Sequence, residues 1–198
     1  NCYKLYDVLN LSDLDVVQGS NQHGEVGLYA ISVANNPSER LFTYIQDGYV
    51  FTKVNGEWAF IDYRGNKTEL VLPSTFVVDN ERVSYYNVYN RAFYDEDTIT
   101  SIKLNSANVI YPYAFADANN LSKVLLNNGV SQIGDCAFLS CGNLKNIVIP
   151  NSTTMLGSRA FMNCLKLQAV RLSDNINEIQ QLTFNCCYEL SKIILPNN

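Results

Sequence analysis

The sequence predicts a solenoid of stacked coils, with one parallel β ladder, short helical or 3₁₀ crossovers between the strands, and an inserted β-hairpin. Two observations predict the ladder. A phenylalanine returns every 22 or 23 residues through the C-terminal half, and a fixed frame of aliphatic residues follows each one. The third observation is an Asn-Gly pair between two alternating segments, which predicts the hairpin.

The repeating unit is clearest in residues 135–157. Its segment Leu144-x-x-Ile147-x-Ile149-Pro150 alternates apolar and polar positions, which indicates a short strand ended by proline. Successive copies are far enough apart for the crossover of about a dozen residues that parallel pairing requires. The repeated phenylalanines are Phe93, Phe115, Phe138, Phe161 and Phe184.

The crossover of each coil contains a second apolar point, at Ile110, Ile133, Leu156 and Ile179, followed by the repeated phenylalanine. An alanine precedes each phenylalanine except Phe184, which follows Thr183. Such a compact segment predicts one short helical or 3₁₀ turn. Burial of one phenylalanine contributes roughly 2–3 kcal/mol, so we expect the stacked rings to form the spine of the fold.

The run A-F-x-x-C-x-x-L-x-x-[IV]-x-[IL]-P, with Ile133-Gly134 ahead of it, resembles the BspA-like leucine-rich repeats. These 23-residue repeats occur in surface and secreted proteins of mucosal and gut bacteria and of some protists. The resemblance covers residues 68–198 and, more loosely, the region before them. It implies a leucine-rich-repeat solenoid, an extracellular or cell-surface location, and adhesion or surface display. It carries over no catalytic residue.

We predict one domain over residues 1–198. Residues 1–40 are expected to form divergent N-terminal coils, because Cys2-x-x-Leu5-x-x-Val8 and Leu28-x-x-Ile31-x-Val33 follow the repeat frame. Residues 41–67 hold the hairpin insertion, and residues 68–198 hold regular repeats with a projecting loop inserted at 74–91. Because no polar capping repeat ends the array, we expect a fragment of a longer protein.

The hairpin is predicted from two β-rich segments, residues 49–54 and 57–63, on either side of Asn55-Gly56. We expect it to pack Trp58 and neighbouring aromatic residues against the solenoid. A second turn at Arg64-Gly65-Asn66 leads back to the repeat frame at Leu70.

Composition excludes several classes of protein. With 47% hydrophobic and 17% charged residues in 198, the chain is unlike a disordered protein, and no apolar run reaches the ~18 residues of a membrane-spanning helix. The net charge of −5 argues against a general nucleic-acid binder.

The sequence offers few groups for catalysis or metal binding. His23 is the single histidine; a nucleophile pair with Cys2 is conceivable, but an exposed loop histidine is favoured. The presence of only one histidine also argues against a zinc site. The acidic run Asp95-Glu96-Asp97 lacks the ligand spacing of a calcium-binding EF-hand. We therefore predict no enzyme, no metal and no cofactor.

Three of the six cysteines, Cys141, Cys164 and Cys187, share one repeat position. Ala118 fills the same position one coil earlier, which favours a column of buried free thiols over disulfides, although the coil spacing would permit a bridge. Cys136 and Cys186 lie off this column and are predicted to be the more exposed thiols.

The outward positions of the predicted strands form the candidate binding surface. Four of them are basic and none is acidic, in a chain that is acidic overall. Such a face suits an acidic protein segment or a sulfated or sialylated glycan, although lysines on strands also keep a sheet soluble. The predicted partner-binding residues are Lys103, Lys123, Leu125, Val148, Arg171, Lys192 and Ile194; the other outward positions are Ser101, Asn146 and Ala169.

These observations lead to two functional hypotheses. The first is a non-catalytic protein- or glycan-binding module of a secreted or cell-surface bacterial protein, with a host or microbial surface molecule as partner. The second is a structural spacer that presents another domain of a longer surface protein.

Tyr111 and Tyr113, on the crossover side, are interpreted as packing residues.

Overall fold

The structure, a computed structural model, describes residues 16–19, 27–33, 36–78 and 80–195 of the chain. The strands are β1 (Val16–Gly19), β2 (Gly27–Val33), β3 (Asn36–Gln46), β4 (Tyr49–Val54), β5 (Glu57–Tyr63), β6 (Glu69–Val71), β7 (Phe76–Val78), β8 (Glu81–Val83), β9 (Tyr86–Val88), β10 (Ser101–Lys103), β11 (Ala107–Ile110), β12 (Lys123–Leu125), β13 (Gln132–Ile133), β14 (Asn146–Val148), β15 (Met155–Leu156), β16 (Ala169–Arg171) and β17 (Lys192–Ile194).

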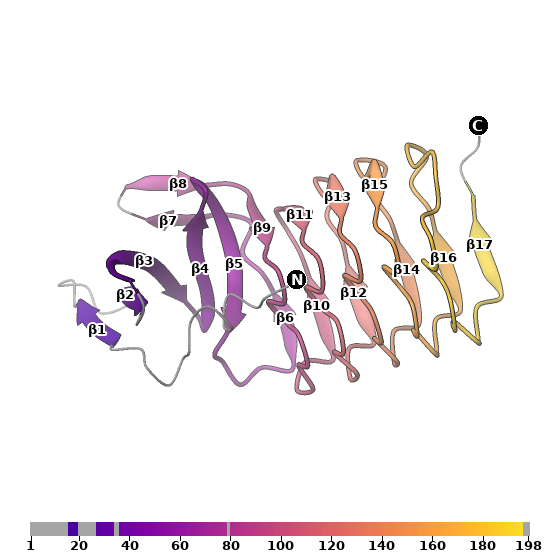
Figure 1. Cartoon of the computed structure of the whole chain (residues 1–198), viewed down its shortest axis with the longest axis horizontal. Coiled ribbons are helices and arrows are strands. Elements are labelled where there is room, and N and C mark those ends of the chain that lie inside the picture. The colour runs from indigo at the N-terminus through magenta and orange to yellow at the C-terminus, as the bar shows by residue number, and fades with distance from the viewer. Residues whose placement is uncertain (1–15, 20–26, 34–35, 79, 196–198) are drawn as a thin grey trace.

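Coils stacked along the long axis form the C-terminal part of the molecule (Figure 1). Strands β6, β10 and β12 pair in parallel, and so do β14, β16 and β17. Equivalent repeat positions lie opposite each other, as where Ile102 pairs with Leu70 and Val124. The predicted solenoid with a parallel ladder is therefore confirmed. We call the exposed side of these six strands the ladder face.

A second parallel ladder runs along the solenoid and consists of β9, β11, β13 and β15. It is formed at the repeated apolar point of the crossover, where Ile110, Ile133 and Leu156 are buried. The sequence predicted only an apolar contact here. Two ladders per coil mean that neighbouring coils are held by backbone hydrogen bonds on two sides.

The crossovers are β-turns, which corrects the prediction of short helical or 3₁₀ segments; the described residues contain no helix. A helix needs negative φ at every residue, whereas Cys136 and Ser140 have φ of 55° and 57°. The same two positions are left-handed in each regular coil, and none is glycine. They are Arg91, Asp95, Tyr113, Asp117, Cys136, Ser140, Arg159, Asn163, Leu182 and Cys186.

Backbone hydrogen bonds between coils hold these turns in place. The amides of the first four repeated phenylalanines donate to a carbonyl of the next coil. The bonds are Phe93 N to Ala114 O (2.7 Å), Phe115 N to Ala137 O (2.8 Å), Phe138 N to Ala160 O (2.8 Å) and Phe161 N to Thr183 O (2.9 Å). An amide that bonds to the next coil cannot close a helical turn, so the interaction between coils replaces the helix.

The phenylalanine rings form the predicted spine. Neighbouring rings from Phe93 to Phe184 are nearly parallel, with centroids 4.9, 4.9, 5.1 and 5.7 Å apart. Phe115, Phe138 and Phe161 are fully buried, whereas Phe184 in the last coil is only partly buried. Phe60 of the hairpin stacks on Phe93 at 4.7 Å and extends the spine toward the N-terminal region.

Two glycines allow the coils to approach each other. A Cβ atom at Gly157 would collide with the backbone of Asp135, and one at Gly134 would lie 2.7 Å from the backbone nitrogen of Pro112. Both residues follow the buried aliphatic residue of the second ladder. Glycine is needed at these positions because the backbone of the preceding coil occupies the space of a side chain.

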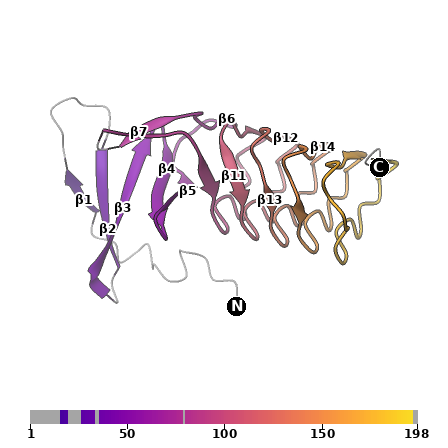
Figure 2. The same cartoon turned by 90° about the horizontal axis from the view of Figure 1, so that it is seen from above.

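The N-terminal strands differ from the prediction. Residues 1–40 were expected to form divergent coils with parallel strands, but β2 pairs antiparallel with both β1 and β3. Strands β1 to β5 form an antiparallel meander (Figure 2). The meander joins the second ladder through parallel pairing of β5 with β9. The segment Cys2-x-x-Leu5-x-x-Val8 lies outside the described residues. The division of the chain into domains stays a prediction.

The predicted hairpin is confirmed as β4 and β5, paired antiparallel. Asn55 and Gly56 both have positive φ, 52° and 84°, as a type I′ turn requires. Trp58 is buried with its ring edge against Phe76, 5.5 Å between centroids. The hairpin therefore packs its aromatic side chains into the core, as the sequence predicted.

The insertion at residues 74–91 is not a projecting loop. It contains the antiparallel pair β7 and β8 and then β9 of the second ladder. Phe76, Val78 and Val83 are buried, and the Phe76 ring stacks on Phe51 at 4.4 Å. Alternation within such short strands buries one face of the hairpin, which the polar turn residues concealed in the sequence.

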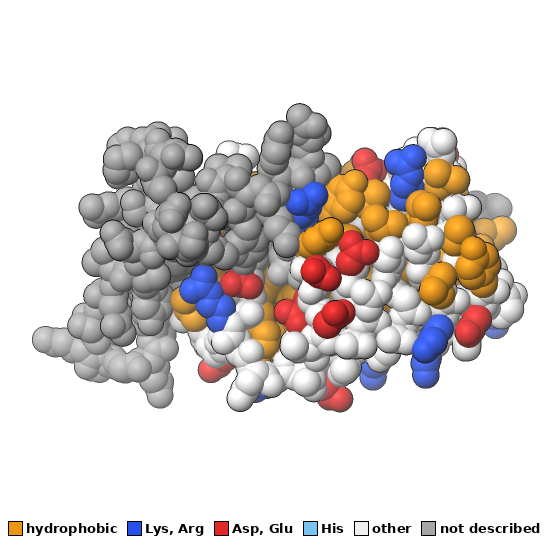
Figure 3. Space-filling view, turned by 60° about the horizontal axis from the view of Figure 1, so that its bottom comes forward, with side chains coloured by type: hydrophobic (Ala, Val, Ile, Leu, Met, Phe, Trp, Pro, Cys, Tyr) orange, Lys and Arg blue, Asp and Glu red, His pale blue; other side chains and the backbone are white. Residues whose placement is uncertain are grey.

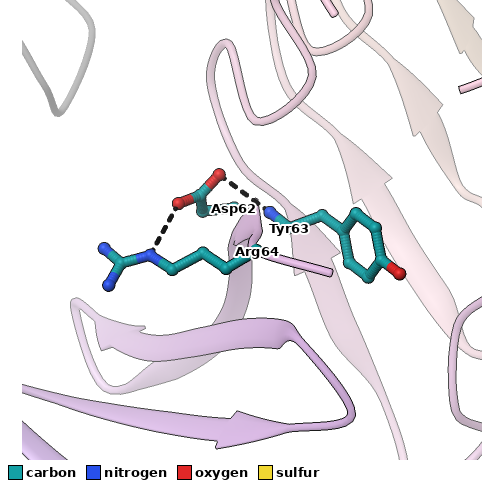
Figure 4. Close-up of polar contacts among 3 residues, drawn as sticks. All are labelled: Asp62, Tyr63 and Arg64. Carbon is teal, nitrogen blue, oxygen red and sulfur yellow. Dashed lines mark hydrogen bonds and ion pairs between the residues drawn. The ribbon is translucent and has the colours of Figure 1, made fainter. Parts of the chain in front are cut away.

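A turn after β5 returns the chain to the repeat frame. Asp62 accepts two hydrogen bonds there, from the backbone nitrogen of Tyr63 (2.8 Å) and from Nε of Arg64 (3.1 Å), as Figure 4 shows. The backbone nitrogen of Arg64 donates to the carbonyl of Gly48 at 2.7 Å. These contacts fix the direction in which the chain enters β6.

The described cysteines, residues 136, 141, 164, 186 and 187, are free thiols. Cys141 and Cys164 are fully buried and donate to the carbonyls of Phe115 and Phe138, each at 3.1 Å. Cys187 continues this column but is half-buried. Cys136 is also buried, at 5% exposure, so its predicted exposure is wrong; Cys186 is half-buried.

The thiols in the column differ in pKa. Burial raises the pKa of Cys141 well above its usual range. A hydrogen bond between the two neighbouring thiols raises the pKa of Cys164, with a further contribution from burial, and lowers the pKa of Cys187. The thiolate is the reactive form, so the half-buried Cys187 is the most reactive member of the column.

Replacement of Phe138 by alanine should lower the free energy of unfolding by about 3–5 kcal/mol, because the ring is buried between two others. Phe184→Ala is the matched control: this ring stacks on one side only, and its loss should cost clearly less. Urea denaturation followed by circular dichroism measures both. If both variants lost the same free energy of unfolding, ring stacking between coils would not explain the stability that Phe138 contributes.

Gly157→Ala should destabilise the protein by roughly 1–3 kcal/mol, because its Cβ collides with the backbone of the neighbouring coil. Gly142→Ala has room, since its nearest neighbour would lie 3.8 Å away, and should be neutral or stabilising. Thermal melting of the two variants compares them. A tolerated Gly157→Ala would show that the coils are less closely packed than described.

Cys187→Ser should lower by one the number of thiols that react with a disulfide reagent in the native protein. Cys141→Ser should leave that number unchanged, because the Cys141 thiol is buried and its pKa is raised. The absorbance of the thiolate that the reagent releases measures the number of reactive protein thiols before and after unfolding in urea. A lower native count for Cys141→Ser would mean that the column opens to solvent.

Candidate functional site

The ladder face carries every residue that the sequence predicted for partner binding. In the first five strands of the ladder face the middle residue is directed inward, as Val124, Ile147 and Val170 show by their burial. The first and third residues are directed outward. The strand geometry therefore produces two columns of outward side chains along the solenoid.

The two columns have different characters. The first contains Glu69, Ser101, Lys123, Asn146, Ala169 and Lys192, and the second contains Val71, Lys103, Leu125, Val148, Arg171 and Ile194. The second column thus contains two basic residues, Lys103 and Arg171, among four apolar ones. Its apolar members are well exposed: Leu125 at 46%, Val148 at 57% and Ile194 at 43%.

Two members of these columns, Glu69 and Val71, were absent from the sequence prediction. Glu69 pairs with Ser101 and Val71 pairs with Lys103 in the parallel ladder. The repeat frame at Leu70 contained the signal, because its two neighbours must then be directed outward. The ladder face therefore has one acidic residue at its N-terminal end.

Among the described residues, no ion pair neutralises the basic side chains of the ladder face. The ion pairs between the described residues are Lys53 with Glu81 (3.0 Å) and Arg64 with Asp62 (3.1 Å), both in the N-terminal region. Lys103, Lys123 and Arg171 are exposed and take part in neither pair. Their positive charge is therefore available to a partner.

A shallow depression of about 480 Å³ lies in the ladder face between β12 and β14. These two strands belong to different hydrogen-bonded sheets, so the ladder is interrupted at this point. Lys123 and Leu125 of β12 and Val148 of β14 line the depression, together with Lys145. The structure thus brings three predicted residues together around one hollow and adds a second lysine; Lys103, Arg171, Lys192 and Ile194 lie on the coils to either side.

The surface around the ladder is divided by chemical type. In the space-filling view, hydrophobic side chains gather over the coils of β12 to β17, and a group of acidic side chains lies beside them (Figure 3). Glu96, in the acidic run, accepts hydrogen bonds from the backbone and hydroxyl of Thr98 at 2.7 and 2.5 Å. The Glu96 carboxylate therefore forms hydrogen bonds within its own turn.

The structure does not test the pair considered for catalysis. His23 and Cys2 lie outside the described residues. Within the described ranges no group of three or more His, Cys, Asp or Glu side chains is arranged to hold a metal ion. No helix in the same ranges is long and apolar enough to span a membrane.

The tyrosines on the crossover side contact one another. Tyr89 and Tyr111 lie 5.3 Å apart between ring centroids, and the Arg91 guanidinium lies over the rings of Tyr94 and Tyr113 at 5.1 and 5.4 Å. Packing between coils accounts for these rings, as the sequence interpretation had it.

Several solved structures are similar to this chain. A leucine rich cell surface protein from Faecalibacterium prausnitzii is 24% identical over 80% of this chain, with a TM-score of 0.67, and the chain spans 44% of its length. A leucine-rich repeat protein from Bacteroides capillosus is 28% identical, with a TM-score of 0.57, over 65% of this chain and 96% of that one. The leucine rich repeat protein of T. pallidum is 25% identical, with a TM-score of 0.57, over 76% and 81%.

A search of curated proteins gives no match. The family model for the BspA type leucine rich repeat region matches residues 85–198 in six copies. This range comprises the coils that carry the phenylalanine spine and most of the ladder face. The chain therefore belongs to the BspA-type leucine-rich-repeat family.

Proposed function

We propose that the chain is a non-catalytic binding module of a secreted or cell-surface bacterial protein, and that its ladder face binds an anionic macromolecule. One observation carries the proposal: along a regular strand ladder, exposed basic side chains that form no ion pair among the described residues lie beside exposed apolar side chains. The similarity to a leucine rich cell surface protein supports the location. Through this binding, the module would serve in adhesion or host interaction.

The spacing of the charges indicates the form of the partner. Lys103 and Arg171 lie three coils apart in the second column, roughly 14 Å at the spacing of parallel strands. Leu125 and Val148 lie between them and offer apolar contact. An extended acidic protein segment, or a sulfated or sialylated glycan, can place negative groups at such intervals and lie along the column.

The depression between β12 and β14 is the proposed centre of the site. Lys123 and Lys145 lie at its margin, with Leu125 and Val148 beside them. A negative group of the partner in this hollow would have two lysines within reach, and it would lose less hydration than in an enclosed pocket. The remaining basic residues would then set the direction of the bound chain.

Purified protein should bind an array of acidic proteins and sulfated or sialylated glycans more tightly at low salt than at high salt. The double reversal Lys123→Glu/Lys145→Glu should weaken that binding about tenfold, which corresponds to about 1.4 kcal/mol. Surface plasmon resonance at two salt concentrations measures both effects.

The matched control is Arg82→Glu/Arg159→Glu, which lowers the net charge equally at exposed positions outside the ladder face. It should bind like the wild type. If both double variants weakened binding equally, the loss of affinity would come from overall charge, and the ladder face would not be the binding site. Absence of binding at either salt concentration would favour the second hypothesis, a structural spacer.

A further inference from the structure

A second surface, which adjoins the depression of the ladder face at Asn128, has the chemistry of a binding site. It is a shallow groove of about 600 Å³ at the edge where the chain turns from the ladder face to the second ladder. Three segments line it: residues 84–85 between β8 and β9, residues 105–108 around the start of β11, and residues 127–129 between β12 and β13. None of the lining residues is an acid or a base.

Tyr85 supplies an aromatic surface to this groove. It is 56% exposed, whereas the adjacent Tyr86 is 1% exposed and belongs to the core. Tyrosine offers a flat apolar ring and one hydroxyl group, so an exposed tyrosine can contact a ligand through both. The insertion at residues 74–91 therefore presents one aromatic side chain beside the turns of the neighbouring coils.

Asparagine side chains form the polar part of the groove and are fixed in position. Asn127 is bound at both ends, since Oδ1 accepts from the Ala107 nitrogen (3.0 Å) and Nδ2 donates to the Ala107 carbonyl (2.9 Å). Asn105 Nδ2 donates to the Leu72 carbonyl at 2.8 Å, and Asn108 Oδ1 accepts from the Ser131 hydroxyl at 2.9 Å. Within the described residues, the second polar atom of both Asn105 and Asn108 is therefore left for a ligand.

The chemistry of the groove selects its ligand. A charged ligand would find no counter-charge there, and a purely apolar one would leave the amides without partners. A neutral sugar has both features that the groove can satisfy: hydroxyl groups that donate and accept hydrogen bonds, and an apolar C–H face that packs on an aromatic ring. An open, shallow groove also suits a polymer that crosses it better than a small molecule, which needs enclosure.

We propose that this groove binds a neutral polysaccharide chain. Tyr85 packs against the apolar face of one sugar unit, Asn105 accepts a hydrogen bond from a hydroxyl, and Asn108 donates one. This proposal does not depend on the anionic partner proposed for the ladder face. The groove adjoins the depression there, since Asn128 lines both, but Tyr85, Asn105 and Asn108 line only the groove.

Affinity electrophoresis through gels that contain mannan, xylan, mixed-linkage β-glucan or starch tests the proposal, with chondroitin sulfate as the charged comparison. We expect at least one neutral polysaccharide to retard the wild-type protein to the same extent at low and high salt. Tyr85→Ala should weaken that binding at least tenfold, and Asn108→Ala should weaken it severalfold. Tyr85→Phe should keep most of it, because the ring is retained.

Tyr188→Ala is the matched control, since this tyrosine is 80% exposed and lies outside the groove. It should bind like the wild type, and Lys123→Glu/Lys145→Glu should do so as well. The fluorescence of Trp58, the single tryptophan, verifies that each variant is folded. Two results would overturn the proposal: no retardation by any neutral polysaccharide, or wild-type retardation of both Tyr85→Ala and Asn108→Ala.

Discussion

The distance between neighbouring coils is the constraint on which the rest of this structure depends. Parallel strands lie about 4.7–4.9 Å apart, and the buried phenylalanine rings stack at 4.9 and 5.1 Å, so backbone pairing and ring stacking agree. At this separation little space remains elsewhere in the coil. Alanine before the ring, glycine at positions 134 and 157, and the column of small thiols all follow from that requirement.

The periodic part of the fold could be predicted from the sequence because each coil repeats the contacts of the last. Alternation around Ile102, Val124 and Ile147 identified which side chains are directed inward, and hence which are exposed on the ladder face. The second ladder was missed because β13 and β15 are two residues long, too short for any alternation. The depression was missed because it lies where the ladder is interrupted between β12 and β14, and no residue type marks that interruption.

The N-terminal region shows a different limit of sequence patterns. The spacing of Leu28, Ile31 and Val33 fits the repeat frame, but the same apolar spacing also suits an antiparallel strand. Strand direction depends on what precedes and follows the strand, and short connections such as Asn55-Gly56 favour antiparallel pairing. The meander that results gives the phenylalanine spine a partner at its first ring, since Phe60 covers Phe93.

The insertion at residues 74–91 has a consequence for how such a protein can change over evolutionary time. Leu70 and Ile102 lie opposite each other in the ladder although the chain between them is longer than in any regular coil. The pairing register of the core strands therefore does not depend on the length of the turn at the coil edge. New segments can enter there, each with its own side chains, while the inner residues of every coil stay under the same selection. A stack of nearly identical coils can thus acquire different outer surfaces without a new fold.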